Sequence, residues 1–231
     1  MSFAVALCSD PDILSLCPYL GPADHDALGS GLGRRDWREE LVNSLGEDVA
    51  KLDLSGTAPG IGCFMKGDKL IVRCIGREYA VGSDGRVSPD TRNPWIKVLL
   101  LHYVRNSGQG DFRDRWVSFS ELKSGFVKAS TFRRECEEPL RGLLDTDIDR
   151  VAALLTGAGA SAVKGFTTDH AWSLDLLPRV RTLILYRSGD EEFPSSLKML
   201  FDAVTDQFID VETLIFLCEG LVHTITGAGL S

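Results

Sequence analysis

The sequence has 231 residues, of which 44% are hydrophobic and 25% are charged, and its formal net charge is −8. A chain of this length and composition buries a core without the help of disulfides or metals, which excludes a disordered or fibrous protein. Its acidic balance would repel a phosphate backbone, and no stretch reaches the roughly 20 apolar residues that cross a bilayer, so we expect neither a nucleic acid nor a membrane as a partner.

The six cysteines are scattered: Cys8, Cys17, Cys63, Cys74, Cys136 and Cys218. No two of them have the two-residue spacing of zinc ribbons, iron–sulfur ligands or thioredoxin-type sites. Scattered cysteines are typical of reduced thiols, and they indicate a cytoplasmic protein. The sequence assigns neither a metal nor a cofactor.

The start of the chain has a different composition from the rest. Residues 1–33 hold three prolines and four glycines, which is typical of irregular covering structure. Asp36 is placed to cap a helix over Trp37 to Ala50. We therefore expect residues 1–59 to form an irregular segment and a helix that pack on a main α+β domain, residues 60–231.

The pattern of residues 60–87 predicts an antiparallel meander. Its apolar runs are separated by the turn sequences Gly67-Asp68, Gly76-Arg77 and Ser83-Asp84-Gly85. A two-residue turn at Gly67-Asp68 pairs Cys63 with Val72, and the resulting sheet has one apolar and one polar face. The apolar face holds Ile61, Cys63, Met65, Leu70, Val72, Cys74, Tyr79 and Val81, and the polar face holds Lys66, Lys69, Arg73 and Glu78.

The segment that follows the meander is predicted to be mainly helical. Pro94 opens a helix over Trp95 to Arg105, and because this helix is apolar around nearly its whole circumference we expect it in the interior. A strand is expected over Arg115 to Ser120. The helical stretch from about Val127 must bend or restart at Pro139, which has no backbone N–H.

The last part of the chain is predicted to contain both helices and strands. Asp147 caps a short helix to Leu155, residues 172–176 alternate like a half-buried strand, and Val180 to Tyr186 form a central strand. Ser195 or Ser196 is expected to cap a helix carrying Leu197, Leu200, Phe201 and Val204, and Asp210 to cap the final helix.

Strands come in hairpins and helices come in separate blocks along this sequence. That order differs from the regular strand and helix alternation of a doubly wound sheet. The predicted fold class is α+β, with an antiparallel meander sheet packed against several helices.

Several strings of residues are familiar together: Ile75-Gly76-Arg77-Glu78-Tyr79, Leu100-Leu101-His102-Tyr103, Trp116-Val117-Ser118-Phe119 with Glu121-Leu122, Leu177-Pro178-Arg179-Val180, and Asp190-Glu191-Glu192-Phe193-Pro194 followed by Leu200-Phe201-Asp202. With them, residues 60–226 resemble a bacterial and archaeal family, domain of unknown function 3786. The resemblance implies an accessory role in anaerobes, beside iron–sulfur or corrinoid enzymes, and it carries over no catalytic residue. Residues 1–59 hold only two cysteines, too few for the four-thiolate cluster of some fused members.

The string Asp190, Glu191 and Glu192, with Asp202 beyond it, is the first candidate site. Clustered carboxylates there could hold Mg²⁺ or Ca²⁺, or act as a proton donor and acceptor pair. The alternative is that these acids stabilise the dipole of the helix expected after them.

Arg77, Arg179 and His102 are the other candidate ligand-binding residues. Each arginine lies at a hairpin turn and could clamp an anion, or form an ion pair with a neighbouring carboxylate. His102 lies on the otherwise apolar helix, where it either finds a partner in the core or lines a cavity.

Three functions are compatible with these residues, and the sequence leaves open whether the chain is an enzyme. The leading hypothesis is a cytoplasmic accessory or ligand-binding domain. The second is a small enzyme that uses Asp190, Glu191, Glu192 and Asp202 around a divalent cation. The third is a structural subunit that docks on a protein partner.

Overall fold

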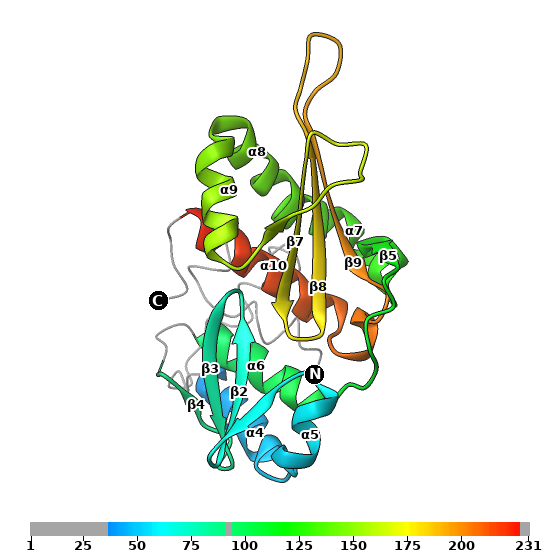
Figure 1. Cartoon of the computed structure of the whole chain (residues 1–231). Helices are drawn as coiled ribbons and strands as arrows, with labels where there is room; N and C mark the ends of the chain where they lie inside the picture. The colour runs from blue at the N-terminus through cyan, green and yellow to red at the C-terminus, as the bar shows by residue number, and fades with distance from the viewer. Residues whose placement is uncertain (1–36, 91–93, 227–231) are drawn as a thin grey trace, which may run out of the picture.

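The computed structural model of the protein describes residues 37–90 and 94–226, which form two antiparallel sheets and the helices around them (Figure 1). The expectations for residues 1–33 and for Asp36 lie outside this part. The strands are β1 (Phe64–Lys66), β2 (Lys69–Cys74), β3 (Arg77–Gly82), β4 (Val87–Ser88), β5 (Trp116–Ser118), β6 (Ser161–Ala162), β7 (His170–Leu177), β8 (Val180–Arg187) and β9 (Ser196–Asp202). The α-helices are α4 (Trp37–Val49), α5 (Leu54–Gly60), α6 (Pro94–Asn106), α7 (Gly125–Phe132), α8 (Glu138–Thr146), α9 (Ile148–Gly157) and α10 (Val211–Thr226).

The first sheet is the predicted meander, with strand order β1-β2-β3-β4. Met65 pairs with Leu70 across Gly67-Asp68, in the predicted register. The second turn is Ile75-Gly76 instead of Gly76-Arg77, because Cys74 pairs with Arg77. The pairing of β2 with β3 therefore differs from the predicted one by two residues. Because side chains alternate between the two faces of a strand, a shift by an even number leaves every side chain on its predicted face. Leu70, Val72, Cys74, Tyr79 and Val81 are buried, and Lys66, Lys69, Arg73 and Glu78 are exposed.

The second sheet has the order β5-β9-β8-β7-β6, with β8 in its centre as predicted. Strand β9 corrects the helix expected after Ser195 or Ser196. Leu197, Met199 and Phe201 alternate along this strand and face the core, and Phe201 pairs with Thr182 of β8. Leu200, which the helical pattern placed beside Phe201, points to the other face and is only half-buried. The predicted α+β class is confirmed.

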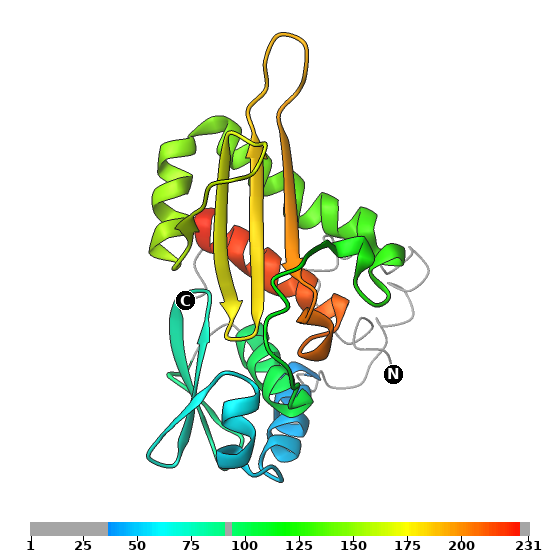
Figure 2. The ribbon, with the colours of Figure 1, turned by 45° about the vertical axis from the view of Figure 1, so that its right-hand side comes forward.

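Helices cover one side of the second sheet. Helices α7, α8 and α10 lie behind strands β7, β8 and β9 (Figures 1 and 2). Between α7 and α8 the chain makes a π-helical segment, Arg133–Glu137, and α8 starts one residue before Pro139, so the bend or restart predicted at this proline corresponds to a change from π-helix to α-helix. Asp147 and Asp210 cap α9 and α10 as predicted.

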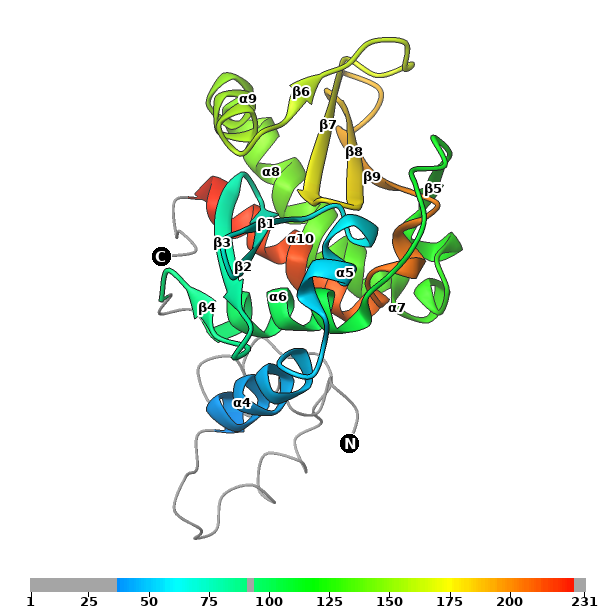
Figure 3. The ribbon, with the colours of Figure 1, turned by 60° about the horizontal axis from the view of Figure 1, so that its bottom comes forward.

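Helix α6 is the interior helix, and it contacts both the half of the molecule that holds the first sheet and the half that holds the second sheet. Helix α4 packs beside it, and its residues Leu45 and Val49 are buried (Figure 3). The buried side chains of residues 45–106 and 117–225 form one continuous cluster. The division of the chain at residue 60 stays a prediction. None of the helices in the described ranges is long and apolar enough to cross a membrane.

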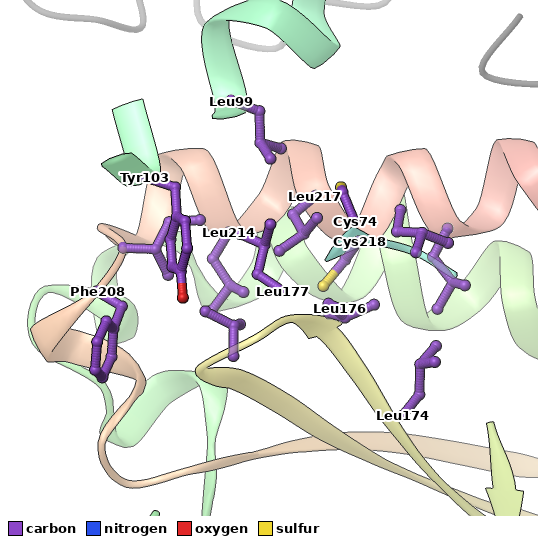
Figure 4. Packing of buried hydrophobic residues seen from close by; sticks show 14 of the residues in the cluster. Cys74, Leu99, Tyr103, Leu174, Leu176, Leu177, Phe208, Leu214, Leu217 and Cys218 are labelled. Carbon is purple, nitrogen blue, oxygen red and sulfur yellow. The ribbon is translucent and has the colours of Figure 1, made fainter. Parts of the chain in front are cut away.

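Tyr103 of α6 joins the two halves by hydrogen bonds. Its hydroxyl donates to the Ile61 carbonyl at 2.7 Å and accepts from the Arg179 amide, in the turn between β7 and β8, at 3.2 Å. Figure 4 shows this hydroxyl directed toward that turn from among the core side chains. The Ile75 amide, in the same junction between the two halves, donates to the Leu176 carbonyl at 3.0 Å. We call this junction the seam. A Cβ on the next residue, Gly76, would lie 2.6 Å from the Ala158 carbonyl oxygen, so only glycine fits this approach.

We expect Tyr103→Phe to lower the free energy of unfolding by about 2 kcal/mol, because it leaves a buried carbonyl and a buried amide without their shared partner. Urea denaturation measures the change. The matched control is Tyr79→Phe, since the Tyr79 hydroxyl bonds the exposed side chain of Arg77 and water can replace it. Equal losses in the two variants would show that the Tyr103 bridge does not hold the seam.

Candidate functional site

A hollow with a volume of about 420 Å³ lies between the junction of α8 with α9 and the hairpin formed by β8 and β9. We call it the hairpin cleft. Its lining combines hydroxyl groups, one carboxylate and two aliphatic side chains. The lining residues are Leu144, Asp145, Ile148, Tyr186, Ser188, Gly189 and Ser195.

The helical wall follows from the amphipathic pattern of α8. Leu140 and Leu144 are buried against the sheet, and the residue after Leu144, Asp145, therefore lies at the rim. The chain then breaks at Asp147, whose side chain accepts a hydrogen bond from the Arg150 amide and starts α9. This break brings Ile148 to the same wall.

The hairpin wall is formed where β8 and β9 leave the sheet. Tyr186 pairs with Leu197 and Arg187 with Ser196, so Ser195 emerges near Tyr186. A Cβ on Gly189 would lie 2.9 Å from the Ser195 amide nitrogen, and only glycine allows the two arms to run this close. Beyond this point the loop projects away from the rest of the molecule (Figures 1 and 2).

The Asp145 carboxylate is the centre of the polar network in the cleft. Its Oδ1 accepts from the Tyr186 hydroxyl at 2.8 Å, and its Oδ2 accepts from the Ser195 hydroxyl at 2.9 Å. Arg141, one helical turn earlier and outside the lining, donates from Nη1 to Asp145 Oδ2 at 2.7 Å and to Ser195 Oγ at 2.9 Å. Helix α8 and both arms of the hairpin are therefore tied at one carboxylate.

Burial raises the pKa of Tyr186, and the hydrogen bond to Asp145 and the charge of Asp145 raise it further. A hydrogen bond from Ser188 and the charge of Arg141 oppose this rise. The phenol therefore keeps its proton at neutral pH and stays a donor to Asp145.

The acidic string of the sequence does not gather with Asp202. Asp190 closes the hairpin loop, where its Oδ1 accepts from the amides of Glu192 and Phe193, and these bonds lower its pKa. Glu191 and Glu192 are exposed. Asp202 lies at the opposite end of β9, is 1% exposed, and accepts from the amides of residues 113, 114 and 204. The alternative interpretation, a helix dipole, is also wrong, because a strand follows.

Arg179 lies at its predicted turn, whereas Arg77 is the first residue of β3, and each has a protein partner. Arg179 Nη1 donates to Asp111 Oδ1 at 2.9 Å, an ion pair in which Asp111 is largely exposed. Its Nε is buried and makes no hydrogen bond within the described residues. The Arg77 side chain is exposed and donates to the Tyr79 hydroxyl. The structure does not bring these two arginines into the hairpin cleft.

His102 is buried in the core on α6. Its Nε2 lies 3.6 Å from Asp210 Oδ2 and its Nδ1 lies 3.4 Å from Asn106 Nδ2. Burial lowers the pKa of His102; the Asp210 charge opposes this shift and the Arg105 charge adds to it. The imidazole is therefore neutral at neutral pH, and it joins α6 to the start of α10.

Within residues 37–90 and 94–226, no three His, Cys, Asp or Glu side chains are grouped so that they could hold a metal ion. Burial raises the pKa of the Cys63 thiol and of the Cys74 thiol to about 12 each, and a nearby Arg179 charge moderates the rise at Cys63. Both thiols lie on the apolar face of the meander, as predicted.

The fold and the cleft define an α+β domain with a small polar hollow at the end of an antiparallel sheet. By sequence comparison, the chain belongs to the family described as a domain of unknown function (DUF3786), whose model matches residues 53–224. This match confirms the family resemblance predicted from the sequence. No curated protein and no solved structure gives a significant match.

The sequence prediction missed the residues of the cleft. Arg141 and Asp145 are four residues apart, which is also the spacing of an ordinary ion pair on a helix surface. Tyr186 looks like the end of a central strand. One signal was present: Leu197, Met199 and Phe201 alternate, and a strand there would have predicted a hairpin that brings Ser195 back to Tyr186.

A strongly perturbed carboxyl group lies outside the cleft, on α10. Burial raises the pKa of Glu219 to about 7, and the charge of Glu135 in the π-helical segment adds to the rise. The folded protein therefore holds this proton more tightly than the unfolded chain does, whose carboxyl has an ordinary pKa of 4.5. The stability from this group is complete below pH 4.5 and is lost as the pH rises through about 7.

We expect Glu219→Gln to remove this pH dependence. The variant should match the wild type at pH 4, below the unfolded pKa, and exceed its free energy of unfolding at pH 8 by about 3 kcal/mol, since each unit of pKa difference contributes about 1.4 kcal/mol. Urea denaturation at the two pH values provides the measurement. Glu191→Gln, an exposed change in the hairpin loop, is the control and should shift neither value; a gain at pH 8 in both variants would contradict the assignment.

We also expect Cys63, Cys74, Cys136 and Cys218 to resist alkylation in the folded protein, because all four are buried and thiolate is the reactive form. Iodoacetamide treatment at pH 8 followed by peptide mass spectrometry should leave these four unmodified, and the same treatment in urea should modify them. Modification of Cys63 or Cys74 at the same rate with and without urea would contradict their place in the core.

Proposed function

We propose that this protein is an accessory domain that binds a small polar ligand in the hairpin cleft. The observation that carries the proposal is the convergence of a carboxylate from α8 and hydroxyl groups from both arms of the hairpin on one hollow of about 420 Å³. Ligand sites are typically hollows of about 300–1,000 Å³ with a few placed polar groups among apolar ones.

The rigidity of the wall supports a binding role. Tyr186 ends a central strand and Leu144 is buried in the core, so the polar groups are attached to elements that packing holds in place. Their hydrogen bonds to Asp145 fix the rotamers further. A site organised before its ligand arrives loses less entropy on binding.

The family resemblance supports the accessory part of the proposal. The resemblance implies that the protein works beside anaerobic iron–sulfur or corrinoid enzymes in the cytoplasm. It assigns no role to any residue of the cleft. The divalent-cation enzyme is not carried forward, since its four acids lie at opposite ends of β9.

A panel of small amines, alcohols, carboxylates and sugars, titrated by protein-observed NMR, tests the binding role. We expect at least one chemical class to shift the amide signals around Tyr186 and Ser195. Ile148→Trp should fill the cleft and abolish these shifts. Leu154→Trp is the matched control, because Leu154 lies on the same helix, is 37% exposed and is outside the lining.

Two results would overturn the proposed function. One is a panel in which no class shifts the cleft signals. The other is a ligand whose binding Ile148→Trp leaves unchanged, which would place the binding site elsewhere.

A further inference from the structure

Two hydroxyl hydrogens of the hairpin cleft are already committed to hydrogen bonds within its wall. The Tyr186 and Ser195 hydroxyls both donate to Asp145, since a carboxylate can only accept. The Ser188 amide is also committed, because it donates to Asp169 Oδ2 at 2.8 Å. The Tyr186 and Ser195 hydroxyls therefore have no hydrogen left for a ligand.

The capacity that remains at the cleft is therefore mainly for accepting hydrogen bonds. Asp145 Oδ1 accepts one bond and has a second acceptor position. The oxygens of Ser188 and Ser195 likewise keep acceptor positions. A ligand that only accepts hydrogen bonds, such as a carboxylate or a phosphate, would find only the Ser188 hydroxyl as a hydroxyl donor in this lining, and it would be repelled by the Asp145 charge.

The charge around the cleft favours the same kind of ligand. The lining contains one carboxylate and no basic side chain. The two segments that form its walls, residues 141–150 and 187–192, carry six carboxylates against three guanidinium groups. Arg141 neutralises part of the Asp145 charge, but it does so from outside the lining.

We infer that the hairpin cleft binds a primary ammonium group carried on a short apolar chain, an inference that rests on the proposed binding function. An ammonium group has three donors and no acceptor, which matches the open positions on Asp145, Ser188 and Ser195. The carbon chain lies against Leu144 and Ile148, the aliphatic side chains of the lining. An alcohol of the same length offers one donor and no charge, and therefore binds more weakly.

Three probes of equal length test the inference: pentylamine, pentanol and pentanoate, titrated by protein-observed NMR at pH 7 and low salt. Pentylamine is expected to bind at least about tenfold more tightly than pentanol, because its hydrogen bond to Asp145 is charge-assisted. Pentanoate is expected not to shift the cleft signals. Added salt should weaken the binding of pentylamine, as it does for exposed charges.

Variants of the wall separate a charge effect from a structural one. Asp145→Asn should weaken pentylamine binding at least about tenfold, while Asp149→Asn, which removes the same charge from exposed α9 surface outside the lining, should weaken it less than about twofold. If the melting curve of Asp145→Asn shows that this variant does not fold, Ser195→Ala provides the test of the inference instead. That variant keeps the pair of Arg141 and Asp145 and should still weaken binding several-fold.

The outcomes distinguish this inference from the function on which it rests. Binding of pentanol or pentanoate at the cleft with equal or higher affinity than pentylamine would overturn the ammonium inference and leave the binding function standing. Pentylamine binding that ignores both Asp145→Asn and Ser195→Ala would also overturn the inference. A cleft that no member of the wider panel occupies would overturn both.

Discussion

The hydroxyl of Tyr103 is the interaction on which the arrangement of the two sheets depends. It satisfies the Ile61 carbonyl, just after α5, and the Arg179 amide, in the turn between β7 and β8. Burial raises the pKa of this phenol, and the nearby Cys63 adds to the shift, so the hydroxyl keeps its proton at neutral pH and remains a donor. A different placement of the second sheet would leave two backbone groups unpaired in the core, at a cost of about 2 kcal/mol, which is a large share of the stability of a typical domain.

That seam also determines where the hairpin cleft can form. Strand β8 begins at Val180, next to the Tyr103 contact, and reaches the cleft with Tyr186. Its neighbours β7 and β9 hold it on both sides, and α8 and α10 pack behind it. The position of the Tyr186 hydroxyl is therefore fixed from the opposite end of the sheet, by a strand that has little freedom to move.

The sequence predicted the elements whose local signals agree with their surroundings. Asp147 and Asp210 are caps in front of amphipathic runs, and Gly67-Asp68 is a hairpin turn between alternating residues, so local and tertiary preferences coincide. In residues 196–202 they do not. Leu197, Leu200 and Phe201 have helical spacing, but pairing with β8 and burial of Met199 stabilise a strand instead.

The candidate site was missed for the same reason. The acids of residues 190–192 are close in sequence to a strand end, but the strand after them carries Asp202 to the far end of the sheet. The residues that do converge, Asp145, Tyr186 and Ser195, are brought together only by the hairpin and the break between α8 and α9. Contacts of this kind depend on which elements pack together, and a single sequence records that only indirectly.

The packing of α4 bears on what counts as the folding unit. The family match begins at residue 53, after this helix has ended, yet Leu45 and Val49 belong to the common core. Gly46 lets the helix approach the turn before β4, where a Cβ would lie 3.2 Å from the Gly85 carbonyl oxygen. Removal of α4 would expose one side of α6 to water, so the segment that matches the family model is shorter than the segment that is needed to bury the core of this protein.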